Sequence, residues 1–295
     1  MNFKAFFASA ALLAIAAPAA AQRDFSQVEI TAEEVAPGIA VLFGAGGNIG
    51  VSYGEDGTVL IDDQYAPLTA KIEAAIADLG ADPVRFLVNT HWHGDHTGGN
   101  ENLGEKGALI FAHDNVRSRL AEGREGERAV PPAPKVALPV VTYGQGVSFH
   151  LNGERIDVMF VGGGHTDGDS VVHWTNSNVV HMGDLYFQIP GYPFIDTNSG
   201  GNVLHAMTSL DAVIRMIDDE TKVIPGHGPL SNKAELVAYR AMIGEAVDRV
   251  RSLRDAGNSL ESTVAAKPLA GFDRGEGFIG PDQFVTAIYR SLENK

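Results

Sequence analysis

The sequence predicts an α+β fold in which layered β-sheets are covered by helices. Short apolar runs typical of strands alternate with amphipathic segments typical of helices, and they do so in two blocks along the chain. A chain of 295 residues has ample material for a hydrophobic core. It shows no internal repeat and no linker, so we expect a single domain over residues 22–295 that ends in a helical tail.

The first block carries several short strands and one helix. Glycine-containing turns separate three runs that we expect to form strands: residues 39–43, 49–53 and 58–62. Residues 67–79 follow as an amphipathic helix, because Pro67 stands at its start and Gly80 directly after it. Residues 84–88 are a short buried strand that delivers the chain to His91.

A surface loop leads into the second block. Residues 108–112 are expected to form a strand and residues 113–120 a helix, and the charged, then proline-rich residues 122–139 form the loop. Further strands are expected at residues 147–150, 155–160, 171–174, 179–182 and 222–224. Helices are expected at residues 203–217, 233–254 and 281–292.

Residues 1–21 have the pattern of a secretory signal peptide. Lys4 gives a basic start, residues 6–17 form an apolar run, and residues 19–21 are three alanines of the kind found at cleavage sites. The run is too short for a membrane span, and no later segment has the roughly 18 apolar residues that one requires. We expect cleavage after Ala21 and a mature protein in the periplasm or outside the cell, with no membrane anchor.

The composition limits both the chemistry and the partners. The chain has no cysteine, so thiolate ligands are excluded, and export without disulfides fits a bacterial periplasm. It carries 37 Asp and Glu against 22 Lys and Arg, a formal net charge of −15. A strongly negative surface repels phosphate backbones, so we expect a small-molecule substrate and no nucleic-acid partner.

The segment 89–100 concentrates the chemistry of the chain. It places four potential metal ligands within six residues: His91, His93, Asp95 and His96. Buried histidines and aspartates need partners, and a divalent metal ion supplies one. In an extended segment the first two project to one side, and the last two can turn toward a second ion beyond Gly94. The motif therefore predicts a centre with two metal ions.

Three more candidate ligands lie in loops that follow strand-like runs, each beside glycines that let the backbone approach closely. They are His165, Asp184 and His227. Each alone is typical of an ordinary loop residue. Together with the four residues of the first motif they complete a set large enough for two ions.

The motifs His-x-His-x-Asp-His, Gly-His-Thr, Gly-Asp and Pro-Gly-His-Gly, in this order, resemble the metallo-β-lactamase superfamily, from about Ile39 to Pro229. The resemblance implies a four-layer αβ/βα sandwich of two mixed β-sheets flanked by helices, with the metals at one edge between the sheets. It implies two zinc ions per chain, held by two sets of side chains: His91, His93 and His165 for one ion, and Asp95, His96 and His227 for the other.

In this family pattern Asp184 would bridge the two ions, and Asp62 would support a ligand from behind. The implied activity is metal-dependent hydrolysis. Two zinc ions share a hydroxide that is available near neutral pH and clamp the attacked carbonyl group. Asp95 and Asp184 are the catalytic candidates, and Asp95 would also orient the nucleophile. The ligand set also suits iron or manganese.

Other residues near these motifs are expected to be structural. Five histidines stand alone on expected helices or strands: His113, His150, His173, His181 and His205. The glycine-rich residues 44–50 lack the lysine of a phosphate-binding loop and are expected to form a flexible flap beside the metals. Aromatic residues after Asp184 fit either core packing or an apolar substrate wall: Tyr186, Phe187, Tyr192 and Phe194.

The export signal favours β-lactamase-like hydrolysis of a cyclic amide, because β-lactams meet their bacterial targets in the periplasm. Clinical β-lactamases of the family with a thiolate ligand have cysteine at the place of Asp184 and commonly lysine at the place of Phe187. That lysine grips the substrate carboxylate, so its absence predicts weak activity on penicillins. Hydrolysis of a lactone, ester or thioester is the alternative. Iron-dependent oxidation, as in sulfur dioxygenases, and a non-catalytic metal-binding module are further hypotheses.

Overall fold

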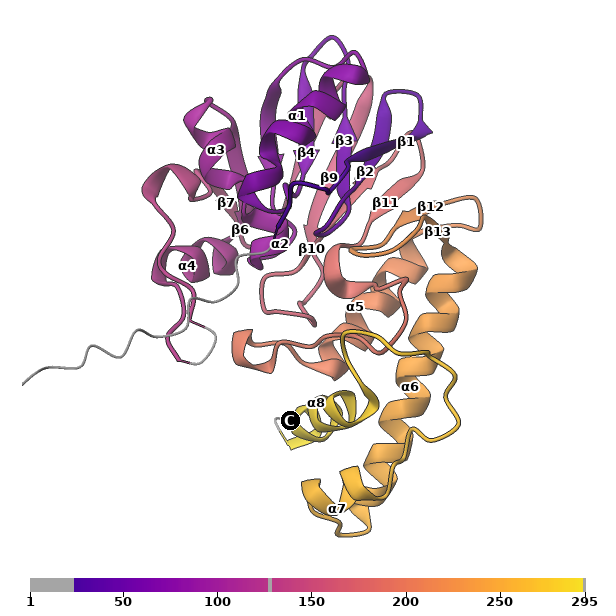
Figure 1. Cartoon of the computed structure of the whole chain (residues 1–295). Helices are drawn as coiled ribbons and strands as arrows, with labels where there is room; N and C mark the ends of the chain where they lie inside the picture. The colour runs from indigo at the N-terminus through magenta and orange to yellow at the C-terminus, as the bar shows by residue number, and fades with distance from the viewer. Residues whose placement is uncertain (1–23, 127–128, 294–295) are drawn as a thin grey trace, which may run out of the picture.

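The computed structural model describes residues 24–126 and 129–293, which form two mixed β-sheets and the helices around them (Figure 1). The first sheet contains, in spatial order, β1 (Thr31–Ala36), β2 (Ile39–Phe43), β3 (Ile49–Ser52), β4 (Thr58–Ile61), β5 (Val84–Val88), β6 (Leu109–His113) and β7 (Val141–Tyr143). The second contains β13 (Ser231–Asn232), β12 (Lys222–Ile224), β11 (Val179–His181), β10 (Ser170–Trp174), β9 (Glu154–Phe160) and β8 (Gly146–Leu151). The expected signal peptide lies outside the described residues.

The helices connect the strands and cover the outer faces of the sheets. They are α1 (Thr69–Asp78), α2 (Gly94–Thr97), α3 (Asn100–Glu105), α4 (Asp114–Glu122), α5 (Val203–Met216), α6 (Lys233–Asp255), α7 (Leu260–Ala265) and α8 (Pro281–Glu293). Short 3₁₀ turns are η1 (Ala66–Leu68), η2 (Lys135–Ala137), η3 (Gly183–Leu185) and η4 (Thr197–Ser199). In the described part of the chain, no helix combines the length and apolarity that crossing a bilayer requires.

The two sheets pack face to face because their strands are apolar on both sides. Alternate residues of a strand point to opposite faces. Val59 and Ile61 of β4 therefore reach the inner cluster between the sheets, while Leu60 reaches the outer cluster under α1. From the second sheet, Trp174 of β10 packs into the same inner cluster and is fully buried. Such runs, buried on both faces, are typical of sheets covered by further layers.

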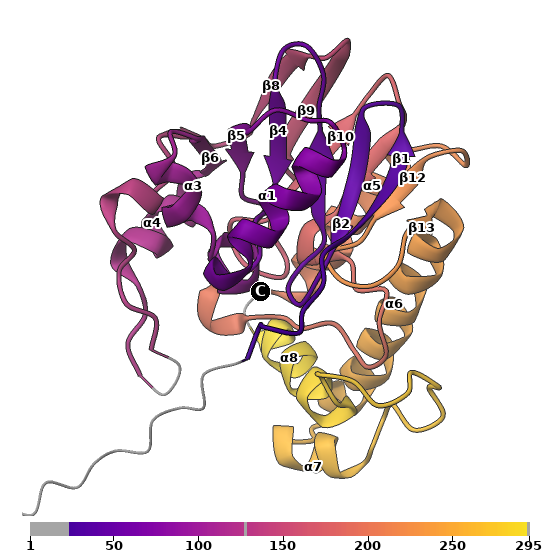
Figure 2. The ribbon, with the colours of Figure 1, turned by 45° about the horizontal axis from the view of Figure 1, so that its top comes forward.

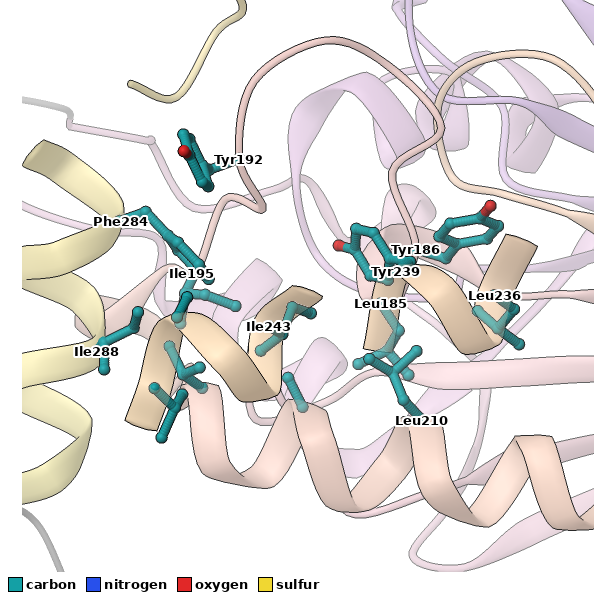
Figure 3. Packing of buried hydrophobic residues seen from close by; sticks show 14 of the residues in the cluster. Leu185, Tyr186, Tyr192, Ile195, Leu210, Leu236, Tyr239, Ile243, Phe284 and Ile288 are labelled. Carbon is teal, nitrogen blue, oxygen red and sulfur yellow. The ribbon is translucent and has the colours of Figure 1, made fainter. Parts of the chain in front are cut away.

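Helices cover both outer faces, which completes four layers. Ile72 and Ile76 of α1 pack on the first sheet, and Figure 2 shows α1 in front of its strands. On the second sheet, α5, α6 and α8 close a large cluster. Figure 3 shows Leu210 of α5, Ile243 of α6 and Phe284 of α8 directed into this common interior. The order of layers is helix, sheet, sheet, helix, which confirms the expected α+β sandwich.

The topology gathers the predicted site at one edge. β4 and β5 run parallel in the first sheet, and β11 and β12 run parallel in the second. The carboxyl ends of parallel strands meet at the same edge of a sheet, where binding sites of such folds gather. The chain leaves these strands at or just before Asp62, His91, Asp184 and His227.

Most expected elements are present, and the differences are at ends and in short pieces. His113 belongs to β6 instead of opening the next helix, because its Nδ1 accepts a hydrogen bond from the amide of Asn115 and so caps α4. The helix expected from residue 67 begins as the 3₁₀ turn η1 and becomes α1 at Thr69. Elements without a sequence expectation are β1, β7, β13, α2, α3 and α7.

Candidate metal centre

Seven side chains from both sheets converge at this edge and form two adjoining groups. One group contains His91, His93, His165 and Asp184, and the other contains Asp95, His96 and His227. Within each group the potential ligand atoms all lie within 4.8 Å of one another. The structure therefore brings all seven candidates from the sequence together, and it places Asp184, expected between the two sets, in the group of His91, His93 and His165.

The first group gathers around ring nitrogens that face one another. The Nε2 atom of His165 lies 2.8 Å from the Nδ1 atom of His93. The ring centroid of His91 lies 4.9 Å from that of His93 and 4.7 Å from that of His165. His91 and His93 come from the loop after β5, and His165 comes from the loop after β9.

The second group likewise brings two ring nitrogens and a carboxylate oxygen close together. The Nε2 atoms of His96 and His227 lie 3.3 Å apart. A carboxylate oxygen of Asp95 lies 3.5 Å from the His227 Nε2 and 4.0 Å from the His96 Nε2. Asp95 and His96 stand on the short helix α2, and the His96 ring lies beside the first group, with its centroid 4.2 Å from that of His91.

Asp184 lies between the two groups, and each of its oxygens faces one of them. Its Oδ2 is 3.7 Å from the His91 Nε2 and 3.4 Å from the His165 Nε2. Its Oδ1 is 3.1 Å from the His96 Nε2 and 3.3 Å from the His227 Nε2. This arrangement requires Gly226, because a Cβ there would lie 2.2 Å from the Asp184 Oδ1.

The donor set fits divalent metal ions. The His91 Nε2 and the Asp184 Oδ1 are buried, and neither has a hydrogen-bond partner within the protein. Buried polar atoms are rarely left without a partner, so the pattern indicates a missing ligand between them. Imidazole nitrogens and carboxylate oxygens are donors that zinc accepts well, and iron or manganese also accept them.

In four of the five rings, all except His227, the nitrogen that faces away from the centre has a partner outside it, which orients the ring. The His96 Nδ1 lies 2.7 Å from the Asp62 Oδ2, as expected for the supporting aspartate. The His91 Nδ1 lies 3.0 Å from the hydroxyl of Thr90, which also donates to Asp62. The His165 Nδ1 donates to the backbone carbonyl of Phe194. The side chain of Asp63 accepts the Gly99 amide and is not among the grouped ligand atoms, while its backbone amide donates to the His96 carbonyl.

Asp196 is a supporting residue that the sequence analysis missed. Its Oδ2 lies 3.0 Å from the His93 Nε2 and accepts hydrogen bonds from Ser199 and Arg124. Burial alone would raise the pKa of Asp196, but hydrogen bonds from His93 and Ser199 and the charges of His93 and Arg124 hold it well below its usual range. No motif marks Asp196, which lies 103 residues from His93 in the chain.

The pKa values in the centre shift in two directions. Burial opposes the charge of His96 and His227, yet the carboxylate of Asp184 raises the pKa of both rings, so a metal ion bound there would displace protons. Burial lowers the pKa of His91 well below its usual value and that of His165 to about 4, so both rings are neutral. Burial opposes the charge of Asp184, yet His96, His227 and the other histidines around it hold its pKa well below its usual value. Neutral imidazole and ionised carboxylate are the forms that bind metal.

The remaining histidines do not join the two groups, in line with the expectation. His181 comes nearest in sequence, but its Nε2 faces the backbone carbonyl of Asn48 and its Nδ1 accepts from the Gly183 amide. His113 stacks on Phe160. The other three lie on the faces of helices or strands: His150, His173 and His205.

The glycine-rich loop between β2 and β3 lies against the centre, and hydrogen bonds hold it there. The Gly47 amide donates to the Asp95 carbonyl, and the Asn48 amide donates to the Gly226 carbonyl. The amide side chain of Gln64 donates to the Gly47 carbonyl. A Cβ at Gly47 would lie 2.1 Å from the His96 ring, so glycine is required. The loop therefore lies beside the centre, as expected, and its flexibility stays a prediction.

A pocket of about 1050 Å³ opens onto the centre. Its wall includes Asp95, Asp184 and His227, and a large part of it is aromatic. The aromatic residues after Asp184 divide between the pocket and the core, and a substrate wall stays a prediction for those in the pocket. Phe187 and Phe194 line the pocket, whereas Tyr186 and Tyr192 are buried in the core of the second sheet.

Comparisons with known proteins agree with this geometry. Residues 43–228 match the family model of the metallo-beta-lactamase superfamily, and this range contains all seven candidate ligands. A probable metallo-hydrolase of Bacillus subtilis is 28% identical over 164 residues, which are 54% of this chain and 75% of that protein. A type 2 metallo-beta-lactamase of Bacteroides fragilis is 26% identical over 162 residues, which are 54% of this chain and 59% of that protein.

A solved structure shares the fold. The metallo-beta-lactamase from Pontibacter korlensis superposes with a TM-score of 0.61 at 22% identity, covering 74% of this chain and 99% of that one. The two mixed sheets with helices on their outer faces are therefore the fold that the motifs implied. The chain belongs to the metallo-beta-lactamase superfamily, and with it to the metal-dependent hydrolases.

Proposed function

We propose that the protein is a dinuclear zinc hydrolase of the periplasm that opens uncharged cyclic amides in a β-lactamase-like reaction, with weak activity on β-lactams that carry a carboxylate. The observation that carries this proposal is the position of Asp184, whose two oxygens face two separate groups of histidines. A carboxylate between two cation sites favours a pair of ions over a single one.

His91, His93 and His165 would hold the first ion, and Asp95, His96 and His227 the second, with Asp184 between them. Zinc bound there would supply a Lewis acid for the carbonyl oxygen and a water that ionises near neutral pH. Asp95 is the carboxylate suited to proton transfer, because its side chain is 28% exposed and lines the pocket, whereas that of Asp184 is 5% exposed. Asp95 would orient the attacking water and take up its proton.

The wall of the pocket argues against tight binding of β-lactam carboxylates. Phe187 occupies the wall beside the second group, where its ring lies parallel to that of His227 at a centroid distance of 5.6 Å. Arg124 is the one basic residue among the described residues that line the pocket, and its guanidinium donates to Asp196. A substrate carboxylate would have to compete with Asp196 for that partner.

Hydrolysis of a lactone or ester is the second candidate. It is favoured by the same apolar wall, because an uncharged ester needs no cationic partner in the pocket. Both reactions use the same centre and the same attack on a carbonyl carbon. They differ in the leaving atom, nitrogen or oxygen, which a comparison of matched substrates resolves.

The test is a hydrolysis panel with mature protein reconstituted with zinc, iron or manganese. The panel contains a cephalosporin, an uncharged β-lactam, an acyl-homoserine lactone, a thioester and a phosphodiester. We expect turnover with zinc, two metals per chain by mass spectrometry, and a lower KM for the uncharged lactam than for the cephalosporin. Turnover that survives complete metal removal would overturn the proposal, as would one metal per chain at full activity.

Export is tested separately. The periplasmic fraction of the producing bacterium should contain a chain that begins at Gln22, as read by N-terminal sequencing. A chain that keeps residues 1–21 and stays in the cytoplasmic fraction would contradict the proposed location.

A further inference from the structure

We infer that Phe278, in the segment between α7 and α8, selects substrates that carry a long alkyl or aryl group, which it holds against Phe194 at the mouth of the pocket. This inference rests on the proposed function and adds the substrate class. The substrates would be neutral esters, lactones or amides with a large apolar substituent on the acyl side.

Phe278 is a large aromatic side chain that the protein leaves open to solvent. It is 71% exposed and lines the pocket that contains Asp95 and Asp184. Contiguous apolar surface beside a pocket marks ligand-binding sites, and the ring of Phe278 is in contact with that of Phe194. The exposed ring is thus available to an apolar group of the substrate.

The ring of Phe278 continues an aromatic surface that begins at the candidate ligands. Its centroid lies 5.8 Å from that of Phe194, and the planes meet at 87°, which is an edge-to-face pair. Phe194 in turn stacks on His93 at 5.7 Å with an interplanar angle of 21°. An acyl chain whose carbonyl carbon lies at the centre would therefore follow Phe194 outward to Phe278.

Hydrogen bonds fix the backbone on both sides of Phe278. The Gly191 amide donates to the Arg274 carbonyl at 2.7 Å, and the Tyr192 amide donates to the Ile279 carbonyl at 3.0 Å. The Arg274 guanidinium donates back to the Gly191 carbonyl. The segment is therefore tied to the loop that carries Phe194, which holds the two rings in one geometry before a substrate binds.

The charges around the pocket favour a neutral substrate. The described residues that line the pocket include one arginine, Arg124. They also include four carboxylates: Asp95, Glu125, Asp184 and Asp196. The Arg124 guanidinium donates to Asp196 and lies 5.2 Å from the ring centroid of Trp92. Outside the two candidate ion sites, a substrate carboxylate would have to compete with Asp196 for Arg124, whereas an alkyl or aryl group would cover aromatic surface.

The segment that carries Phe278 also lies beyond residues 43–228, the part of the chain that matches the family model. The centre is built inside the matched range, and Phe278 approaches it from the C-terminal tail. The selectivity would therefore be a feature of this chain's own tail, added to a site that the family shares.

The first test compares acyl-homoserine lactones that differ only in the acyl chain, butanoyl against dodecanoyl. Phe278→Ala should raise KM for the dodecanoyl compound by about 3- to 10-fold, the worth of one aromatic contact, and leave kcat and the butanoyl KM unchanged. Phe278→Trp should keep the wild-type preference. Val140→Ala is the matched control, because Val140 is 64% exposed and is absent from the pocket wall.

A binding measurement separates this inference from the hydrolase proposal. Dodecan-1-ol and butan-1-ol carry no bond to hydrolyse, and Trp92 lines the pocket as a fluorescent reporter. In the zinc-loaded protein, dodecan-1-ol should shift the tryptophan emission at a lower concentration than butan-1-ol does. Phe278→Ala should raise the Kd of dodecan-1-ol by the same factor as it raises the KM of the dodecanoyl lactone. Equal binding of both alcohols, or no effect of Phe278→Ala, would overturn the inference. Alcohol binding without any hydrolysis would refute the proposed function alone.

Discussion

Asn48 ties the glycine-rich loop of the first sheet to the loop that carries His227. Its side-chain Nδ2 donates to the Pro225 carbonyl at 2.9 Å and to the Gly228 carbonyl at 2.8 Å. These carbonyls flank His227 on both sides, and Asn48 itself is 4% exposed. We therefore expect Asn48→Ala to loosen the second group of ligands while leaving the first group intact.

The magnitude follows from the two lost hydrogen bonds. Each contributes about 1 kcal/mol net, so the free energy of unfolding should fall by about 2 kcal/mol. A partner that orients a metal ligand affects metal affinity by roughly 10- to 100-fold, so zinc at the second site should weaken by that factor. Asn48→Asp should cost more than Asn48→Ala, because a carboxylate would face two carbonyl oxygens.

Two assays separate the effects. Urea unfolding of the metal-free protein gives the change in stability, and competition with a chromophoric chelator gives the affinity of each zinc. Asn102→Ala is the control, because the Asn102 Nδ2 likewise donates two hydrogen bonds, to Ala66 and Thr69, away from the centre. Asn102→Ala should lower stability without changing zinc affinity. If Asn48→Ala binds both zinc ions as tightly as wild type, the positioning argument is wrong.

Three further predictions address the bridge, the pocket and the second sheet. Asp184→Asn removes the charge shared by the two groups, so we expect turnover to fall at least about 100-fold and the metal content to drop. Steady-state kinetics and mass spectrometry measure these two effects, and unchanged turnover would refute the bridging role. Phe187→Lys should lower KM for cephalosporins, because it supplies a cation to the pocket wall, and an unchanged KM would show that the carboxylate binds elsewhere. Burial lowers the pKa of the half-buried His173, so its contribution to stability is full above its unfolded pKa of about 6.5 and falls as the pH drops below that value. Urea unfolding at pH 7.5 and 5.5 should show a smaller acid loss for His173→Gln than for wild type, and identical losses would contradict this assignment.

The sequence specified the centre well because its ligands carry their own signal. His91, His93 and His96 stand in one short motif, and the structure places Asp62 behind His96 as the family pattern implied. Asp196 carried no such signal. Its role depends on a hydrogen bond to His93 that only the folded chain brings together. A side chain that supports a ligand from a distant loop has no characteristic neighbours in sequence.

The fold also contains elements that the sequence predicted and elements that it did not. Strands buried on both faces, such as β4 and β11, were evident from continuous apolar runs. The edge strand β1 was missed, because four of its six residues are exposed and only half of the six are apolar. Phe278 was missed for a related reason. A lone phenylalanine in a loop has no periodic pattern, and its meaning comes from the ring of Phe194 beside it.

The candidate ligands come from both halves of the sandwich, so cations bound there would cross-link the two halves. His91 to His96 follow a strand of the first sheet, whereas Asp184 and His227 follow strands of the second. A ligand that binds only the folded chain stabilises it by about 2.7 kcal/mol at a free concentration 100 times its Kd. The amount of intact protein would then follow the supply of metal in its compartment. When metal is scarce, the interface between the two sheets would open more often and become accessible to proteases, although every catalytic side chain is still present.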